Sequence, residues 1–406
     1  MSSEWIEHKL SDLATFKYGK FLAKSALSAE GFPVYSGYGV VGYLPDYHFE
    51  DSQLLIVCRG EGGTGDVKMS PKKCSITNLS IVISPKEQLV SRKFLYWALK
   101  ASDTRRLRTG SAQAQIVIAA LENLPISIPL GSEIQSSVVE FLDSLDDRIT
   151  LLRETNITLE SIAQAIFKSW FVDFDPVRAK MNGLAPEGMD EEVAGLFPNG
   201  FEESELGDIP RGWHIDGLHN ILLMRNERTQ PSEATKALPY VPVDSITAKS
   251  PFLMDFKSGE DANSSLILFH KGDILFGAMR PYFHKVCIAP FDGVTRTTVF
   301  TLMPRIANAR EFALFLAFQD ATIEYAAQHS EGSTIPYAKW RNSLENMPTV
   351  IPSEVLQERY SNIVAPLIDK ANQNNALIHN LSELRDVLLP RLISGQLQIP
   401  EAEAIA

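Results

Sequence analysis

Apolar residues recur at alternating steps of three and four between Ser132 and Trp170. The positions are Leu142, Leu145, Ile149, Leu152, Asn156, Leu159, Ala163, Ile166 and Trp170. This spacing places them on one face of a helix and is typical of a coiled-coil seam, which needs a partner helix to bury it. Asn156 is polar, so it costs stability at the seam but can fix the register of pairing. The alternative is one long core helix of a single globular domain.

A second stretch of the same character begins at Ser353. A shift that sets Leu145 on Leu367 also sets Ile149 on Ala371. The seam residues of the second copy include Leu367, Asn374, Leu377, Leu381 and Leu388. Pro366 predicts a kink near the start of this helix, and Pro390 with Gly395 predicts its end. We therefore expect two long helices, at 132–172 and 353–396, that pair with each other.

The repeat extends upstream of both helices. Trp5 and Leu10 are spaced like Trp213 and Leu218, and Leu124-Pro125 matches Met347-Pro348. Matching strings in the same order indicate a tandem duplication rather than chance similarity. Short apolar runs between turn signals predict α+β heads with mostly β cores. The expected organisation is a head at 1–131, a first helix at 132–172, a linker at 173–212, a second head at 213–352, a second helix at 353–396 and a tail at 397–406.

Composition sets limits on location and partners. The three cysteines are widely spaced, which argues against disulfides and zinc sites, and no apolar run approaches a membrane span. We therefore expect a cytoplasmic protein. The net charge of −12 is unfavourable for binding nucleic acid, yet residues 1–130 carry 15 Lys and Arg against 12 Asp and Glu, a net +3. The positive net charge of the first head is therefore compatible with DNA binding.

Side chains that suit DNA contacts lie in turn-flanked loops of both heads. Arginine can pair with guanine and glutamine with adenine in the major groove, and lysine neutralises phosphates. The candidates in the first head are Arg59, Lys68, Lys72, Lys73, Arg105, Arg108, Ser111, Gln113 and Gln115. Those in the second head are Arg280, Tyr282, Lys285, Arg296, Ser333 and Thr334. The alternative interpretation of each is an ordinary solvated charged face.

Catalytic patterns are weak or missing. Asp46, Asp66 and Lys68 loosely fit the acid–acid–lysine spacing of metal-dependent nucleases, but this pattern is degenerate and has no counterpart in the second head. The sequence contains neither a His-Glu-x-x-His pair nor a Gly-x-Ser-x-Gly elbow. We expect a non-catalytic chain that reads DNA. A stand-alone nuclease and a protein–protein adaptor without a DNA role stay open as alternatives.

Several strings together resemble a known family. They are Ser169-Trp-Phe-Val-Asp-Phe-Asp-Pro-Val-Arg-Ala-Lys180, Leu196-Phe-Pro198, Ser204-Glu-Leu-Gly207 and Leu388-Leu-Pro-Arg-Leu-Ile-Ser-Gly395. With the repeated upstream strings, they make nearly the whole chain similar to the specificity subunit of Type I restriction-modification enzymes.

The resemblance implies a role in an assembly. Each head would be a target recognition domain for one half of a bipartite double-stranded DNA site. The two helices would pair antiparallel, separate the heads and dock methyltransferase subunits, and a motor-nuclease subunit would join the complex. S-adenosylmethionine, ATP and magnesium would be bound by these partners, and no cofactor by this chain.

Overall fold

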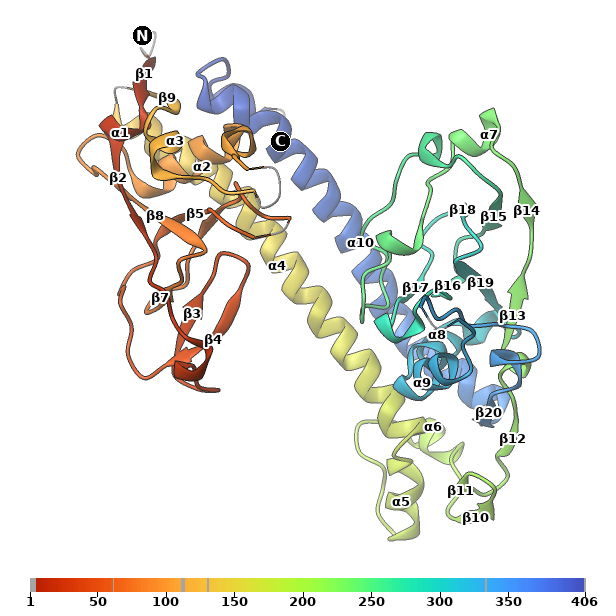
Figure 1. The fold of residues 1–406 in the computed structure, drawn as a ribbon. Helices are drawn as coiled ribbons and strands as arrows, with labels where there is room; N and C mark the ends of the chain where they lie inside the picture. Colours follow the sequence, from red (N-terminus) through yellow and green to blue (C-terminus); the bar gives the residue numbers. More distant parts are fainter. Residues whose placement is uncertain (1–4, 61, 111–113, 130, 333, 405–406) are drawn as a thin grey trace. The chain divides into compact units, whose positions relative to one another are not determined.

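The computed structural model describes residues 5–60, 62–110, 114–129, 131–332 and 334–404, and its backbone is shown in Figure 1. The chain divides into two compact units. Unit 1 comprises residues 1–150 and 379–406, and unit 2 comprises residues 151–378. Each long helix therefore contributes one part to unit 1 and the other part to unit 2.

Unit 1 contains three small sheets and short helices. Its sheets are the pair β1 (Trp5–Lys9) and β9 (Pro125–Pro129), the four-stranded sheet β2 (Ala14–Tyr18), β8 (Ser80–Pro85), β5 (Leu54–Val57) and β6 (Val67–Met69), and the three-stranded sheet β4 (Val40–Leu44), β3 (Phe32–Tyr35) and β7 (Ser75–Ile76). Its shorter helices include α1 (Leu10–Leu13), α2 (Arg92–Ala101), α3 (Ile118–Glu122) and α11 (Ile399–Glu403).

Unit 2 repeats this plan. Its sheets are β12 (His214–Gly217) with β20 (Pro348–Ile351), then β13 (Leu222–Arg225), β19 (Val299–Pro304), β16 (Ile274–Gly277) and β17 (Val286–Ile288), then β14 (Arg228–Thr229), β15 (Leu266–Phe269) and β18 (Gly293–Thr295). Its helices include α7 (Glu233–Lys236), α8 (Arg310–Phe318) and α9 (Asp320–Gln328). The many Pro, Gly and acidic residues of the linker predict an irregular segment with a short helical piece near 191–196. The structure has that piece as α6 (Glu191–Gly195), and it adds α5 (Asp175–Met181) and the hairpin β10 (Phe201–Ser204) and β11 (Gly207–Pro210).

The tandem duplication is confirmed by equivalent strands and equivalent hydrogen bonds. The four-stranded sheets have the same order, since β2-β8-β5-β6 corresponds to β13-β19-β16-β17. The Leu10 amide donates to the Leu124 carbonyl at 2.9 Å, and the Leu218 amide donates to the Met347 carbonyl at 3.0 Å. These are the residues that the sequence alignment matches, so the repeated strings maintain the same backbone connection in each unit.

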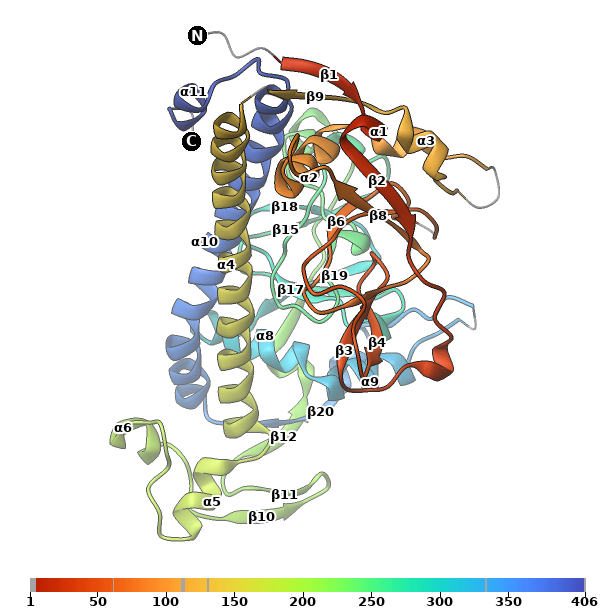
Figure 2. The same cartoon turned by 90° about the vertical axis from the view of Figure 1, so that its left-hand side faces the viewer.

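Two helices of 40 residues, α4 (Ser132–Phe171) and α10 (Glu354–Ile393), pack against each other within each unit. In unit 1 the start of α4 meets the end of α10, with Leu142 and Leu388 buried in one cluster. In unit 2 the Tyr360 hydroxyl near the start of α10 donates to the Ala163 carbonyl in the later part of α4 at 3.1 Å. Early residues of one helix thus meet late residues of the other, which is antiparallel pairing (Figure 2).

The buried stripe differs in detail from the predicted seam. Leu142, Leu145, Ile149, Asn156, Ala163, Trp170, Asn374, Leu381 and Leu388 are buried, whereas Leu152, Leu159, Ile166, Leu367 and Leu377 are only half-buried. Phe167, which the heptad pattern omits, is 1 % exposed. It contacts Phe312, Phe315 and Tyr360 in unit 2. The helix therefore turns its apolar face toward the globular core as well as toward its partner helix.

Several local predictions are wrong. The proline at position 390 lies inside α10, which continues to Ile393. Ser132 and Gln135 have the spacing that predicts a capping box, but the buried Gln135 side chain donates to the Leu89 carbonyl at 3.0 Å and accepts from the Ser91 amide at 3.1 Å. This glutamine instead ties α4 to the loop before α2. Gln357 makes a related bond to the Pro352 carbonyl at 3.0 Å.

Other errors concern element ends. The apolar pattern over 94–107 predicts one helix, but α2 ends at Ala101 and a 3-10 turn follows at Thr104–Leu107. The matching pattern over 312–327 also predicts one helix, which breaks at Gln319 into α8 and α9. The string Pro239-Tyr-Val-Pro-Val predicts a strand, but it forms only isolated bridges through Tyr240. Throughout the described part of the chain, no helix combines the length and apolar character needed to cross a membrane.

Candidate nucleic-acid interface

Three loops of unit 1 meet at the end of β5. The Cys58 amide donates to the Leu79 carbonyl at 2.8 Å, and the Cys58 carbonyl accepts from the Ile116 amide at 2.9 Å. One residue further, Arg59 forms an antiparallel bridge with Gln115, which in turn bridges to Thr109. The glycine-rich turn after β5 is therefore held beside Thr109 and Gln115, and Gln115 is one of the predicted DNA contacts.

The glycine-rich turn is a hairpin connection between β5 and β6. Tyr38 packs on it and donates its hydroxyl to the Arg59 carbonyl at 3.1 Å. A Cβ atom at Gly63 would lie 2.5 Å from the Tyr38 ring, and Gly60 has φ +118°. Both positions require glycine because a larger residue would collide with the tyrosine ring or adopt a strained backbone. No helix follows this turn directly, so it lacks the geometry of a nucleotide-binding loop.

Five predicted residues of unit 1 come together around this turn: Arg59, Lys68, Arg105, Arg108 and Gln115. Asp66 binds two of them, with an Arg105 Nη2 to Asp66 Oδ1 distance of 2.8 Å and a Lys68 Nζ to Asp66 Oδ2 distance of 3.9 Å. The Arg108 Nε donates to the Thr64 carbonyl at 2.8 Å. The guanidinium of Arg59 lies 5.8 Å from the centroid of the Tyr18 ring.

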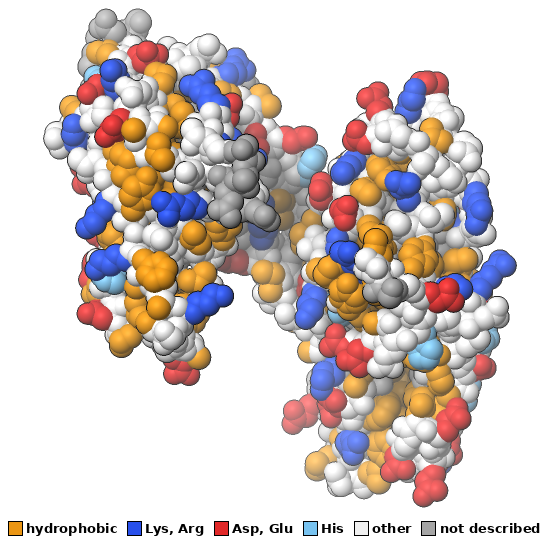
Figure 3. All heavy atoms as spheres, in the orientation of Figure 1, with side chains coloured by type: hydrophobic (Ala, Val, Ile, Leu, Met, Phe, Trp, Pro, Cys, Tyr) orange, Lys and Arg blue, Asp and Glu red, His pale blue; other side chains and the backbone are white. Residues whose placement is uncertain are grey.

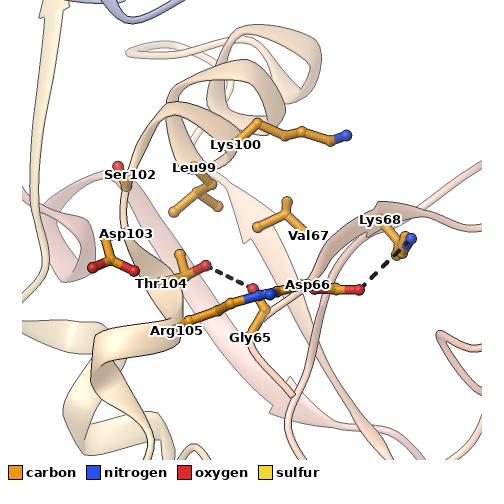
Figure 4. Close-up of a pocket in the computed structure, with 10 residues that line it drawn as sticks. All are labelled: Gly65, Asp66, Val67, Lys68, Leu99, Lys100, Ser102, Asp103, Thr104 and Arg105. Carbon is orange, nitrogen blue, oxygen red and sulfur yellow. Dashed lines mark hydrogen bonds and ion pairs between the residues drawn. The ribbon is translucent and has the colours of Figure 1, made fainter. Parts of the chain in front are cut away.

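A pocket of about 290 Å³ lies between β6 and the end of α2 (Figure 4). Lys68, Lys100 and Arg105 line it together with Asp66 and Asp103. Burial, followed by the nearby positive charge of Arg385, lowers the pKa of Lys100. The pocket therefore combines three basic side chains with two acidic ones at the margin of the glycine-rich turn.

Some predicted residues of unit 1 lie elsewhere. Lys72 and Lys73 are in the turn before β7, at the opposite end of the β5–β6 hairpin, and Lys73 pairs with Glu50 at 3.8 Å. Ser111 and Gln113, like Ser333 of the second head, are outside the described residues.

Unit 2 builds the same scaffold with different side chains. The Ala278 amide donates to the Thr298 carbonyl at 2.9 Å, and its carbonyl accepts from the Ala338 amide at 2.8 Å. Met279 then bridges to Tyr337, and Tyr337 bridges to Glu331. The bridge between Glu331 and Tyr337 in unit 2 is thus the structural counterpart of the bridge between Thr109 and Gln115 in unit 1.

The predicted residues of unit 2 flank this scaffold. Arg280 has φ +51°, and its amide donates to the Pro336 carbonyl at 2.7 Å. Tyr282 is 51 % exposed in the following turn, and Arg296 and Thr334 are exposed on adjoining loops. Lys285 differs, because its ammonium group donates to the Val243 carbonyl at 2.8 Å within the unit.

The nuclease alternative is not favoured by this geometry. Asp66 is committed to Arg105 and Lys68, and Asp46 accepts from the Tyr47 amide at 2.7 Å in the turn after β4. Within the described ranges, no three His, Cys, Asp or Glu side chains are grouped so that they could hold a metal ion.

Sequence reasoning missed the aromatic residues of the two scaffolds. Tyr18 and Tyr38 lie against Arg59, and Tyr337 occupies the place of Gln115. The alignment that sets Gly110 on Gly332 also sets Gln115 on Tyr337, so the signal for Tyr337 was present in the repeat. Figure 3 shows Lys and Arg side chains interspersed with apolar ones on the displayed face of unit 1, rather than a continuous basic surface.

Comparisons with known proteins agree with this architecture. Residues 2–161 match the family described as Type I restriction modification DNA specificity domain. The MjaIX specificity subunit of Methanocaldococcus jannaschii is 26% identical over 87% of this chain and 79% of its own length. The HindI specificity subunit of Haemophilus influenzae is 25% identical over 78% of this chain and 80% of its own length.

A solved structure shows the same fold. The Type I restriction-modification S subunit from M. genitalium superposes with a TM-score of 0.62 at 17% identity, over 96% of both chains. The fold defines a protein of two duplicated α+β heads, each packed on part of an antiparallel helix pair. The sequence matches are to specificity subunits of Type I restriction-modification systems, and the fold is that of such a subunit, so both agree with the resemblance.

Proposed function

We propose that this chain reads a bipartite double-stranded DNA sequence within a Type I restriction-modification complex, one half-site per unit. The observation that carries the proposal is the duplicated loop scaffold, which has the same backbone bonds in both units but different side chains. A protein that read the same sequence twice would need the same side chains in both places. Different side chains on one scaffold suit two different half-sites.

The chain itself is not an enzyme in this proposal. Methyltransferase subunits supply S-adenosylmethionine chemistry, a motor-nuclease subunit uses ATP, magnesium is bound by these partners, and the complex works in the cytoplasm. Exposed apolar side chains on the long helices support docking of partners: Leu151, Ile157 and Ile162 on α4 are 63%, 65% and 43% exposed. Apolar side chains grouped on an exposed helix are typical of protein-binding surfaces.

The test is to assemble the chain with its methyltransferase subunit and map methylated adenines on a random DNA library. We expect one asymmetric motif with two read segments and an unread gap, and loss of methylation when this chain is omitted. Methylation that lacks a motif, or that does not need the chain, contradicts the proposal. DNA cleavage by the chain alone with magnesium contradicts its non-enzymatic role.

A further inference from the structure

We propose that three bridged side chains in each unit decide which bases that unit reads. They form the reading triplet, which is Arg59, Gln115 and Thr109 in unit 1 and Met279, Tyr337 and Glu331 in unit 2. The inference rests on the proposed function and assigns its sequence specificity to particular positions.

The backbone of the triplet is the same in both units. Thr109 and Gln115 exchange two hydrogen bonds of 2.9 and 3.0 Å, and Glu331 and Tyr337 exchange two of 3.0 and 2.8 Å. The glycine that follows the third member has a left-handed φ in both cases, +92° at Gly110 and +94° at Gly332. Two copies of one short antiparallel ladder, each with a left-handed glycine at the same place, therefore present three side chains at equivalent positions.

The triplet is accessible and its members are adjacent. Arg59, Gln115, Thr109 and Glu331 are exposed, and Met279 and Tyr337 are half-buried. Residues opposite each other on an antiparallel ladder have Cβ atoms about 5 Å apart. This is close enough for the three side chains to contact neighbouring base pairs, which are stacked about 3.4 Å apart along the DNA axis.

The chemistry of the two triplets differs. Among the described residues, no ion pair involves Arg59, so its guanidinium is free to bind guanine, and Gln115 can pair with adenine. In unit 2, the Tyr337 hydroxyl donates to the Thr297 carbonyl, which leaves the ring rather than the hydroxyl for a ligand. Met279 and this ring suit a thymine methyl, and Glu331, paired with Lys339 at 2.5 Å, can accept from the cytosine amino group.

The other basic residues of unit 1 suit contacts with the DNA backbone rather than with the bases. Arg105 and Lys68 share Asp66, and Arg108 is bound to the Thr64 carbonyl. Asp66 holds Arg105 and Lys68 at the pocket beside β6 and offsets part of their positive charge. They are suited to positioning the DNA backbone, which contributes affinity without sequence information.

The experiment maps methylated adenines with the assembled complex of full-length chain and methyltransferase subunit, for Arg59→Ala, Gln115→Ala and Tyr337→Leu. We expect each unit 1 variant to lose about 10- to 100-fold discrimination at one base of one half-site, as loss of a bidentate base contact predicts. Tyr337→Leu should relax only the other half-site. Tyr337→Phe, which keeps the ring, should retain the motif.

Lys9→Ala is the control, because this exposed lysine lies in β1 of unit 1 and is not among the candidate DNA contacts. It should leave the motif unchanged. Melting curves of each variant separate loss of base recognition from loss of folding. If Tyr337→Leu unfolds unit 2, Tyr337→Phe still tests whether the ring alone retains the motif. The inference is overturned if the triplet variants lower methylation equally at all sequences, or if they alter both half-sites. If the unsubstituted complex shows no bipartite motif, the proposed function itself is overturned.

Discussion

Glu160 is a half-buried acidic residue of α4 within unit 2. The Gln164 side chain donates to its Oε1 at 2.9 Å. Burial raises the pKa of Glu160 to about 7, and hydrogen bonds with Ser250 and Gln164 oppose this rise only in part. The carboxyl group therefore binds its proton more tightly in the folded protein than in the unfolded chain.

This shift predicts a pH-dependent effect of Glu160→Gln. Because the pKa of Glu160 is higher in the folded protein than in the unfolded chain, protonation of this group stabilises the fold. The stabilisation is complete below about pH 4.5 and is lost as the pH rises to about 7. The neutral glutamine avoids the loss, so at pH 8.5 the variant should be more stable than the unsubstituted protein, by about 1 kcal/mol once solvent screening of the half-buried carboxyl group is included. At pH 4.5 the two proteins should melt alike. Thermal melting of unit 2 at both pH values measures this.

The exposed Glu154, six residues earlier on the same helix, provides the control. Glu154→Gln should change the melting temperature by the same small amount at both pH values. A Glu160→Gln variant with no gain at pH 8.5 would mean that the carboxylate is well solvated in the folded protein.

At the scale of elements, a polar cluster lies between the paired helices of unit 2. Asn374 donates to Asn156 Oδ1 at 2.8 Å, and Asn156 donates to the Ala371 carbonyl at 3.2 Å and to Asn375 Oδ1 at 2.7 Å. Asn156 and Asn374 are 2% and 1% exposed. Each was predicted to be the polar residue of its own helix, and the fold brings them into direct contact. The bonds restrict the helices to the register in which the two amides meet.

Replacing one asparagine should cost more than replacing both. Asn156→Leu leaves the buried Asn374 amide without its acceptor, at a cost of about 1–3 kcal/mol. In the double variant Asn156→Leu/Asn374→Leu the unpaired Asn374 amide is gone, and only the half-buried Asn375 Oδ1 has lost its donor, so stability should recover most of the loss. A double-mutant cycle from denaturant unfolding of unit 2 measures the coupling. Additive losses from the two substitutions would argue that the hydrogen bond contributes nothing to pairing.

At the scale of the whole molecule, the features that depend on short-range patterns of residues were predicted from the sequence. Apolar periodicity predicted a helix over 132–172, and α4 spans Ser132–Phe171. The repeated strings predicted the duplicated heads, because Leu124 and Met347 occupy the same place in the strand pairing of both units. These features depend on residues that are close in the sequence or repeated in order.

Contacts between distant residues could not be predicted in the same way. Asp66 and Arg105 are paired although they are far apart in the chain, and nothing in either string indicates that the acid offsets the charge of the predicted DNA contact. Lys285 likewise bonds to the distant Val243 carbonyl. The division into units was also unexpected, since the predicted boundaries kept the helices separate whereas each unit contains part of both helices.

That division predicts how truncation acts. The last part of α10 and the segment after it bury five apolar side chains in the core of unit 1, namely Leu388, Leu389, Leu392, Ile393 and Leu397. Burial of each such side chain stabilises by about 1.5–3 kcal/mol, so removing all five removes an amount comparable to the whole stability of a typical domain. A chain that ends at Ile378 should therefore have an unfolded unit 1 and a folded unit 2. Hydrogen exchange should show lost protection in β2, β5 and β8 and retained protection in β13, β16 and β19.

Two controls accompany this truncation. A chain that ends at Glu403 keeps all five side chains and should retain the protection of both units. Adding a peptide of residues 379–406 to the short chain should restore protection to unit 1. Full protection of β5 and β8 in the short chain without the peptide would show that unit 1 folds without α10.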